Sequence, residues 1–305
     1  MTLFINKSME ITLSQFAGFC DGVKRAFETV IALATENPNE NTFVYLGKKM
    51  KKPVFVLGSL VHNQDVVGKI EEKGIKRIDM EKFVQALPGE IGTIIITAHG
   101  SGPREYEIAK IKGIDLIDTT CPKVIKVQRL AQTFVKKGYN LILVGDKDHK
   151  EVKSIYEWGG GKTMVISNSE ELEKVDFDPG QKIIILSQTT QSQDFLAAVY
   201  EYIKKKYKNV EIIDTICMET RQRQGELKEL AKKSDAMVII GSTDSANSTR
   251  LYEISKVINP KSVFVSRVGE LNDAFFKGAR KVGVTAGAST PEWIIADVLE
   301  YLGKL

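Results

Sequence analysis

The 305-residue sequence predicts an α/β protein built on parallel sheets. Two observations carry this prediction. Short β-branched runs alternate with longer amphipathic stretches from one end of the chain to the other, which is typical of α/β folds. Most of these runs are continuously apolar without polar alternation, as expected for strands buried on both faces of a parallel sheet.

The expected strands are short apolar runs, and two stretches show helical spacing between them. Apolar residues recur every three or four positions from Val23 to Ala34 and from Val124 to Val135, which predicts amphipathic helices there. The strands are expected at Phe43–Leu46, Thr93–Thr97, Leu116–Asp118, Asn140–Val144, Met164–Ser167, Ile183–Ser187, Glu211–Asp214, Ala236–Ile240, Ser262–Ser266 and Val282–Thr285.

Composition excludes several classes of protein. The net charge is only +4, from 43 basic and 39 acidic residues, which argues against a nucleic-acid partner. Hydrophobic and charged contents of 43% and 27% are those of a globular protein. The apolar runs are far shorter than the ~18 residues of a membrane span, and Met1–Ser8 does not resemble an export signal. With three cysteines, an odd number, a cytoplasmic protein without disulfides is expected.

The three cysteines are evenly spaced along the chain. Cys20, Cys121 and Cys217 are separated by 101 and 96 residues. The segment Leu116–Cys121 (LIDTTC) matches Ile212–Cys217 (IIDTIC), and both cysteines lie between an expected strand and an expected helix. A period near one hundred residues predicts three α/β units of one kind, each with one thiol at a strand-to-helix turn.

Domain boundaries follow from this repeat, because no linker marks them. We expect a first α/β unit at residues 9–121 with Cys20 and a second at residues 122–216, entered from Cys121. A third unit with Cys217 is expected at residues 217–290, followed by a C-terminal helix at residues 291–305.

Three thiols at helix N-termini favour a soft metal or an iron–sulfur cluster, since the helix dipole stabilises thiolates. Structural zinc usually takes four ligands in closely spaced pairs, and the chain has no C-x-x-C. Three thiolates on a four-iron cluster would leave one iron open for substrate. The alternative is that each cysteine is a small buried hydrophobic residue.

The three histidines, His62, His99 and His149, fall at expected strand ends or turns. Imidazole donates to anions, and His149 with Glu151 suits an acid–base pair. Polar clusters follow three expected strands, at residues 187–190, 241–248 and 286–291. Their hydroxyls suit either helix N-caps or an anion site, and a diphosphate could bind at the last two without a lysine.

Together these segments resemble the LytB (IspH) family of 4-hydroxy-3-methylbut-2-enyl diphosphate reductases. The matching motifs follow the family's order across residues 9–293: Gly18-Phe19-Cys20 with Gly22-Val23, Val61-His62-Asn63, Ala98-His99-Gly100, Thr120-Cys121-Pro122, His149-x-Glu151-Val152, Gln188-Thr189-Thr190, Ile216-Cys217, Ser245-x-Asn247-Ser248 and Ala286-Gly287-Ala288-Ser289. The chain departs from the family pattern at Ala17, Lys150, Ser154 and Ala246, and in the additional Met1–Ser8.

The resemblance implies three pseudo-threefold-related α/β domains, trefoil-like, around a central [4Fe–4S] cluster. Cys20, Cys121 and Cys217 would be its ligands, with one iron left open. The enzyme would convert 4-hydroxy-3-methylbut-2-enyl diphosphate to isopentenyl and dimethylallyl diphosphate by two-electron reductive dehydroxylation. Electrons would come from a donor such as ferredoxin or flavodoxin.

The resemblance also implies roles for the remaining motif residues. Glu151 would be the proton source, with His149 and Thr189 ordering the substrate hydroxyl and the proton path. The diphosphate would be held by His62, His99, Ser245, Asn247 and Ser289. Two alternatives stay open, a related reductive dehydratase of another allylic alcohol and a non-catalytic iron–sulfur sensor.

Overall fold

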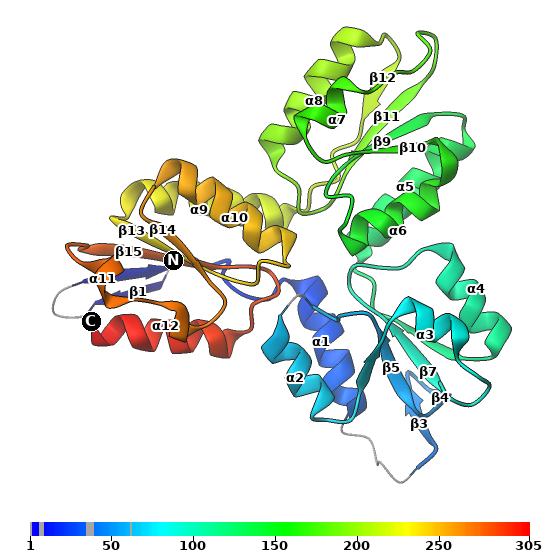
Figure 1. Cartoon of the computed structure of the whole chain (residues 1–305), viewed down its shortest axis with the longest axis horizontal. Coiled ribbons are helices and arrows are strands. Elements are labelled where there is room, and N and C mark those ends of the chain that lie inside the picture. The colour runs from blue at the N-terminus through cyan, green and yellow to red at the C-terminus, as the bar shows by residue number, and fades with distance from the viewer. Residues whose placement is uncertain (1, 6–8, 35–39, 62) are drawn as a thin grey trace. The chain divides into compact units, whose positions relative to one another are not determined.

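The computed structural model describes residues 2–5, 9–34, 40–61 and 63–305 and divides the chain into two compact units. We call Met1–Asp21 with Cys217–Leu305 the terminal unit and Gly22–Ile216 the central unit. The central unit contains two parallel four-stranded sheets and a small hairpin, and the terminal unit contains one five-stranded sheet (Figure 1).

The first sheet of the central unit has the strand order β6-β5-β7-β8, and all of its neighbours pair in parallel. A buried core of isoleucine and phenylalanine side chains, including Phe83 and Ile94, supports it. The elements of this part are α1 (Asp21–Ala34), β3 (Thr42–Tyr45), β4 (Lys48–Lys51), β5 (Val54–Leu57), α2 (Gln64–Glu71), β6 (Lys76–Ile78), α3 (Met80–Gln85), β7 (Thr93–Ile96), α4 (Pro103–Lys112) and β8 (Asp115–Asp118).

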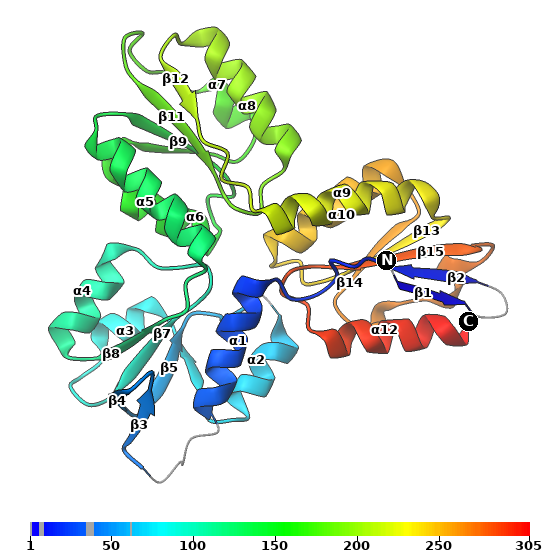
Figure 2. The same cartoon turned by 180° about the vertical axis from the view of Figure 1, so that it is seen from behind.

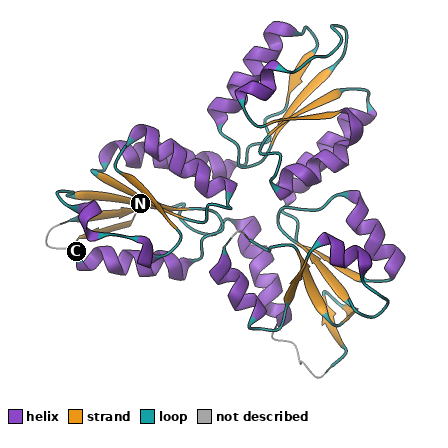
Figure 3. Cartoon of the chain, viewed as in Figure 1, coloured by secondary structure: helices purple, strands orange, loops and turns teal. Residues whose placement is uncertain are grey.

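The second sheet of the central unit has the order β10-β9-β11-β12, again parallel throughout. Helices cover both of its faces (Figure 3). Ile142 and Val144 pack in one hydrophobic cluster, whereas Leu141 and Leu143 of the same strand pack in another. The elements are α5 (Pro122–Lys136), β9 (Asn140–Val144), α6 (Lys150–Gly159), the 3₁₀ turn Gly160–Lys162, β10 (Thr163–Ile166), α7 (Ser169–Glu173), β11 (Ile183–Ser187), α8 (Gln193–Lys206) and β12 (Val210–Ile212).

The sheet of the terminal unit has the order β1-β2-β15-β13-β14, with only the β1–β2 pair antiparallel. Its core again splits between two faces, with α12 on one and α9 and α10 on the other (Figure 2). The elements are β1 (Thr2–Ile5), β2 (Glu10–Leu13), α9 (Met218–Lys233), β13 (Ala236–Ile240), α10 (Ala246–Ile258), β14 (Ser262–Val265), the 3₁₀ turn Val268–Glu270, α11 (Asp273–Phe276), β15 (Lys281–Ala286) and α12 (Glu292–Lys304).

The predicted α/β class with parallel sheets is confirmed. Three expected strands have the observed bounds: Asn140–Val144, Ile183–Ser187 and Ala236–Ile240. Each of the other expected strands overlaps an observed strand. No helix in the described ranges is long and apolar enough to cross a membrane. The predicted division at residues 121, 216 and 290 stays a prediction.

One expected strand belongs to a different kind of sheet. Phe43–Tyr45 of the expected strand Phe43–Leu46 lie in β3, which pairs antiparallel with β4 rather than joining a parallel sheet. Leu46 and Gly47 have φ values of 48° and 77° and form a two-residue turn of the kind that closes hairpins. Leu46 is 85% exposed at that turn, so its apolar side chain does not signal burial.

Candidate functional site

Each cysteine lies where the sequence predicts, ahead of a helix. Cys121 and Cys217 are the N-cap residues of α5 and α9, which follow β8 and β12, and Cys20 directly precedes α1. All three are described and partly exposed, and none forms a disulfide. Helix N-termini favour thiolates, so all three positions suit metal ligation.

The two units divide the cysteines between them. Cys20 and Cys217 belong to the terminal unit and Cys121 to the central unit. Within the ranges that the structure covers, no group of three or more His, Cys, Asp or Glu residues gathers as a metal site. The three-cysteine ligand set therefore stays a prediction. The donors themselves fit an iron–sulfur cluster, because all are thiols outside disulfides at helix N-termini.

Cys121 is held closely against α1 within the central unit. A Cβ atom added at Gly22 would lie 2.8 Å from the Cys121 Sγ, so only glycine permits this approach. Arg25 donates from Nη2 to the carbonyls of Thr119 and Thr120, at 3.1 and 2.6 Å. The segment leading into Cys121 is thus fixed by a glycine and an arginine of the same helix.

Glu151 is a buried carboxyl group with two hydrogen bonds from one residue. It is 2% exposed. The amide N–H of Thr189 donates to Oε1 at 2.7 Å, and the Thr189 hydroxyl donates to Oε2 at 3.0 Å. Burial raises the pKa of Glu151 to about 7, against the opposing effect of the two Thr189 hydrogen bonds. A carboxyl group with this pKa can hold and release a proton near neutral pH.

His149 is the N-cap of α6, the helix that carries Glu151. Its Nδ1 accepts a hydrogen bond from the Glu151 backbone N–H at 3.2 Å. The neutral imidazole therefore carries its hydrogen on Nε2, which makes that atom a donor. The His99 ring lies edge-on to it, with centroids 5.2 Å apart. The Ser154 hydroxyl contacts the carbonyls of both His99 and Glu151, at 3.3 and 2.8 Å.

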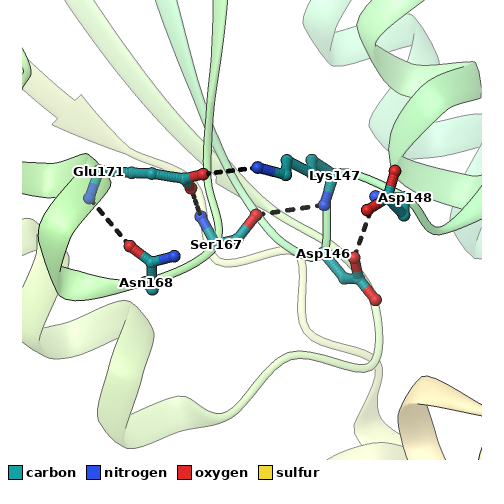
Figure 4. Close-up of polar contacts among 6 residues, drawn as sticks. All are labelled: Asp146, Lys147, Asp148, Ser167, Asn168 and Glu171. Carbon is teal, nitrogen blue, oxygen red and sulfur yellow. Dashed lines mark hydrogen bonds and ion pairs between the residues drawn. The ribbon is translucent and has the colours of Figure 1, made fainter.

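The loop between β9 and His149 is braced by hydrogen bonds (Figure 4). Asp146 accepts from the Asp148 N–H, and the Ser167 hydroxyl accepts from the Lys147 N–H. The Lys147 ammonium pairs with Glu171 at 3.2 Å, and Glu171 also accepts from the Ser167 N–H. Asp146, Lys147 and Asp148 lie between β9 and His149, so these contacts fix the backbone that leads to His149 and α6.

Lys150 is the first residue of α6 and its ammonium is buried. Its Nζ donates to the Leu57 carbonyl at the end of β5. Burial lowers the pKa of Lys150 to about 8, and the nearby Glu105 carboxylate acts in the opposite direction. The Lys150 side chain thus links the helix that carries Glu151 to the end of β5.

In the terminal unit, serines and an asparagine meet at the carboxyl edge of the sheet. Ser245, the N-cap of α10, accepts hydrogen bonds from the hydroxyls of Ser248 and Ser289, at 3.1 and 3.2 Å. Asn247 is 7% exposed, and its Nδ2 has no hydrogen-bond partner among the described residues. A buried amide donor without a partner, at a helix N-terminus, is suited to an anionic ligand.

Two glycines allow this cluster to form. A Cβ atom at Gly241 would lie 2.3 Å from the Ser248 Oγ, and one at Gly287 would lie 1.9 Å from it. Gly241 and Gly287 directly follow β13 and β15, which are neighbouring parallel strands. Ligands of open parallel sheets bind at this edge, between strand ends and helix N-termini.

Comparison with known proteins assigns the family. The family model described as LytB protein matches residues 11–303. The chain belongs to the LytB family. The resemblance seen in the ordered motifs is thereby confirmed.

Relatives of this LytB chain align over nearly its whole length. A 4-hydroxy-3-methylbut-2-enyl diphosphate reductase from Geotalea daltonii is 39% identical over 97% of this chain and 98% of its own. One of the same name from Caldanaerobacter subterraneus is 36% identical over the same shares of the two chains.

Two solved structures are similar to this LytB chain. The reductase structure from Plasmodium falciparum has a TM-score of 0.85 at 31% identity, covering 99% of this chain and 88% of that one. A second, described as the terminal enzyme of the non-mevalonate pathway, has a TM-score of 0.64 at 33% identity, covering 97% and 99%.

Within each unit, the structure brings together some of the residues that the LytB resemblance implies. In the central unit Glu151, Thr189 and His149 are connected by hydrogen bonds, and His99, which the resemblance assigns to diphosphate binding, lies against His149. In the terminal unit Ser245 and Ser289 are hydrogen-bonded beside Asn247. His62, predicted to bind the diphosphate, lies outside the described residues.

Some contributors to these clusters were not selected from the sequence. Ser154, noted only as a departure from the family, bridges the carbonyls of His99 and Glu151. Gln188 accepts the Asp146 N–H with Oε1, and its buried Nε2 has no partner in the part of the chain that is described. Gln188 belongs to the motif Gln188-Thr189-Thr190, but the sequence predicted no role for it. Ser154 gave no sequence signal, because its partners lie on another loop.

Proposed function

We propose that this chain is a 4-hydroxy-3-methylbut-2-enyl diphosphate reductase of isoprenoid precursor synthesis. It removes the substrate's terminal hydroxyl as water, with two electrons and two protons, and gives isopentenyl and dimethylallyl diphosphates. The observation that carries the proposal is the buried Glu151, whose pKa of about 7 and Thr189 contacts suit proton delivery. End-to-end relatives with this name support it.

Cys20, Cys121 and Cys217 would hold a [4Fe–4S] cluster with one open iron. When bound, the cluster supplies the electrons and a Lewis acid for the leaving hydroxyl. The support is the donor set, three thiols outside disulfides ahead of helices. Ferredoxin or flavodoxin suits the role of electron donor. We also propose a cytoplasmic location, which three cysteines outside disulfides support.

Glu151 delivers the proton that turns the leaving hydroxyl into water. Thr189 fixes both carboxyl oxygens, so the acid is oriented before substrate arrives. His149 has Nδ1 committed to the helix and offers its Nε2 hydrogen to the substrate or to the proton path. This arrangement separates positioning, by Thr189 and His149, from proton transfer, by Glu151.

The diphosphate is bound by neutral donors. Asn247 offers an amide hydrogen that has no partner among the described residues, and Ser245 and Ser289 offer hydroxyls at the N-terminus of α10. His99 and His62 are proposed to complete the set. Binding energy at the remote diphosphate positions the reacting carbon without contributing to the chemical step directly.

The proposal is tested by anaerobic reconstitution with iron and sulfide, followed by assay with an artificial reductant. A brown protein that converts the diphosphate substrate to the two products is expected. Profiling other allylic alcohols in the same assay separates this function from a related dehydratase. A protein whose cysteines take up no iron contradicts the proposal.

The pH dependence of the reaction should follow Glu151. Because the protonated carboxyl is the active form, kcat should fall about tenfold per pH unit as the pH rises above its pKa, which lies near 7. Thr189→Val removes a hydrogen bond that favours the ionised form, so the profile should move to higher pH. Glu170→Gln, on the exposed side of α7, is the control. An unchanged midpoint in Thr189→Val contradicts this assignment.

Asn247→Ala should weaken binding of the diphosphate. Hydrogen bonds to charged groups contribute about 1.5–3 kcal/mol, so KM should rise by about 10- to 100-fold with a smaller change in kcat. Steady-state kinetics would measure both constants. Asn272→Ala, which alters an asparagine cap of α11 in the same unit, should leave KM unchanged. An unchanged KM in Asn247→Ala removes this residue from the site.

A further inference from the structure

One face of α9 binds the segment that carries Cys20. Glu219, Arg223 and Glu226 are spaced by four and three residues, which places them on the same side of the helix. Glu219 accepts from the Asp21 N–H at 3.3 Å. Glu226 accepts from the Gln15 N–H at 3.1 Å and from the Ser14 hydroxyl. Helix α9, whose N-cap is Cys217, therefore fixes the chain on both sides of Cys20.

Arg223 is the buried member of this face, at 4% exposed. Its guanidinium donates to the Gly18 carbonyl at 3.0 Å and to the Ala286 carbonyl. The backbone N–H of Cys20 donates to the Ala288 carbonyl at 3.3 Å. Arg223 thus joins the two loops whose contact fixes the position of Cys20.

The charges around Arg223 include both cysteines of the terminal unit. Burial lowers its pKa, and Cys20, Glu219, Glu226 and Cys217 raise it, in that order. The guanidinium stays charged in proteins, and a buried charge needs a compensating one. The Arg223 guanidinium donates to two neutral carbonyls, and the carboxylates of Glu219 and Glu226 on the same face of α9 supply negative charge. Cluster ligation at Cys20 and Cys217 would place further negative charge near this guanidinium.

We propose that Arg223 is a positioning residue that holds Cys20 and Cys217 as a prearranged pair of cluster ligands and supplies buried positive charge beside them. The proposal rests on the function proposed above. Positive charge near an iron–sulfur cluster favours its reduced, more negative form, so it raises the reduction potential. Arginine is suited to this role, because its planar fork binds two carbonyls while keeping its charge.

The test compares Arg223→Gln, which removes the charge, with Arg223→Lys, which keeps it but loses the fork. Arg250→Gln removes a cation that pairs with Glu253 on α10 of the same unit, and is the matched control. Each protein is reconstituted anaerobically. Iron and sulfide content and the midpoint potential, by spectroscopically monitored titration, are then measured.

We expect Arg223→Gln to bind less iron and to shift its potential to more negative values, with a smaller potential shift in Arg223→Lys. Arg250→Gln should match the wild type. Wild-type iron content and potential in Arg223→Gln overturn the proposal. A wild-type protein that binds no iron overturns the proposed function instead, so the two failures are distinguishable.

A variant that binds no iron is still informative as apoprotein. Loss of the guanidinium that holds the Gly18 carbonyl should loosen the segment that carries Cys20, so the alkylation rate of Cys20 should rise. Cys121, which belongs to the central unit, is the internal control. Circular dichroism confirms that the variant is folded. Equal alkylation rates in the wild type and Arg223→Gln overturn the proposal.

Discussion

Glu151→Gln should lower kcat by about 100-fold or more, the usual contribution of general acid–base catalysis. Glutamine has nearly the shape of glutamate, and its side-chain carbonyl still accepts the Thr189 N–H that now binds Oε1. It has no acidic proton near neutral pH, so the leaving hydroxyl must take its proton from water. Steady-state rates of the reconstituted enzyme would measure the loss.

The control measurements for this variant are its iron content and its thermal stability. Iron content and thermal unfolding of Glu151→Gln should match the wild type, since Glu151 contacts Thr189 and the α6 N-terminus but is not among the proposed ligands. Glu170→Gln should retain full activity. Full activity in Glu151→Gln would mean that another residue is the acid. If the protein were instead a non-catalytic iron–sulfur sensor, this variant would keep its sensing output.

Much of the candidate site was predictable from sequence because it depends on local patterns. A strand followed by a cysteine and a helix is visible in Leu116–Cys121 and again in Ile212–Cys217, and the structure makes both cysteines N-caps. Helical spacing also located α1 and α5. Such features need only the residues within one turn or one strand, so periodicity and capping chemistry reveal them.

The missed features depend on contacts between distant parts of the chain. Arg223 bonds the Gly18 carbonyl across 205 positions, and Ser154 bonds the His99 carbonyl across 55. Side chains that bind carbonyls leave no residue-specific pattern at the partner position, because every residue has a carbonyl. The strand β5 was missed although Val54–Leu57 is wholly apolar, since short apolar runs are ambiguous by pattern alone.

Cys121→Ser should lose most of its iron while the apoprotein stays folded. Mutation of a residue that only hydrogen-bonds to a metal ligand typically lowers metal affinity about 10- to 100-fold. Loss of the ligand itself should have a larger effect. The change from sulfur to oxygen is small, and Cys121 is partly exposed, so the apoprotein's free energy of unfolding should change by about 0.5 kcal/mol or less. Iron analysis after reconstitution and thermal unfolding of the apoprotein would measure the two effects.

If Cys121→Ser kept its iron but lost apoprotein stability, Cys121 would be a packing residue rather than a ligand. Its Sγ lies so close to α1 that a Cβ atom at Gly22 would be 2.8 Å away, so a purely structural role predicts lower apoprotein stability when the sulfur is replaced. Thr133→Ser, an exposed change on the same helix α5, sets the baseline for both measurements. Iron loss without a loss of apoprotein stability is the outcome that only a ligand role explains, because packing contributes to stability whether or not a cluster is bound.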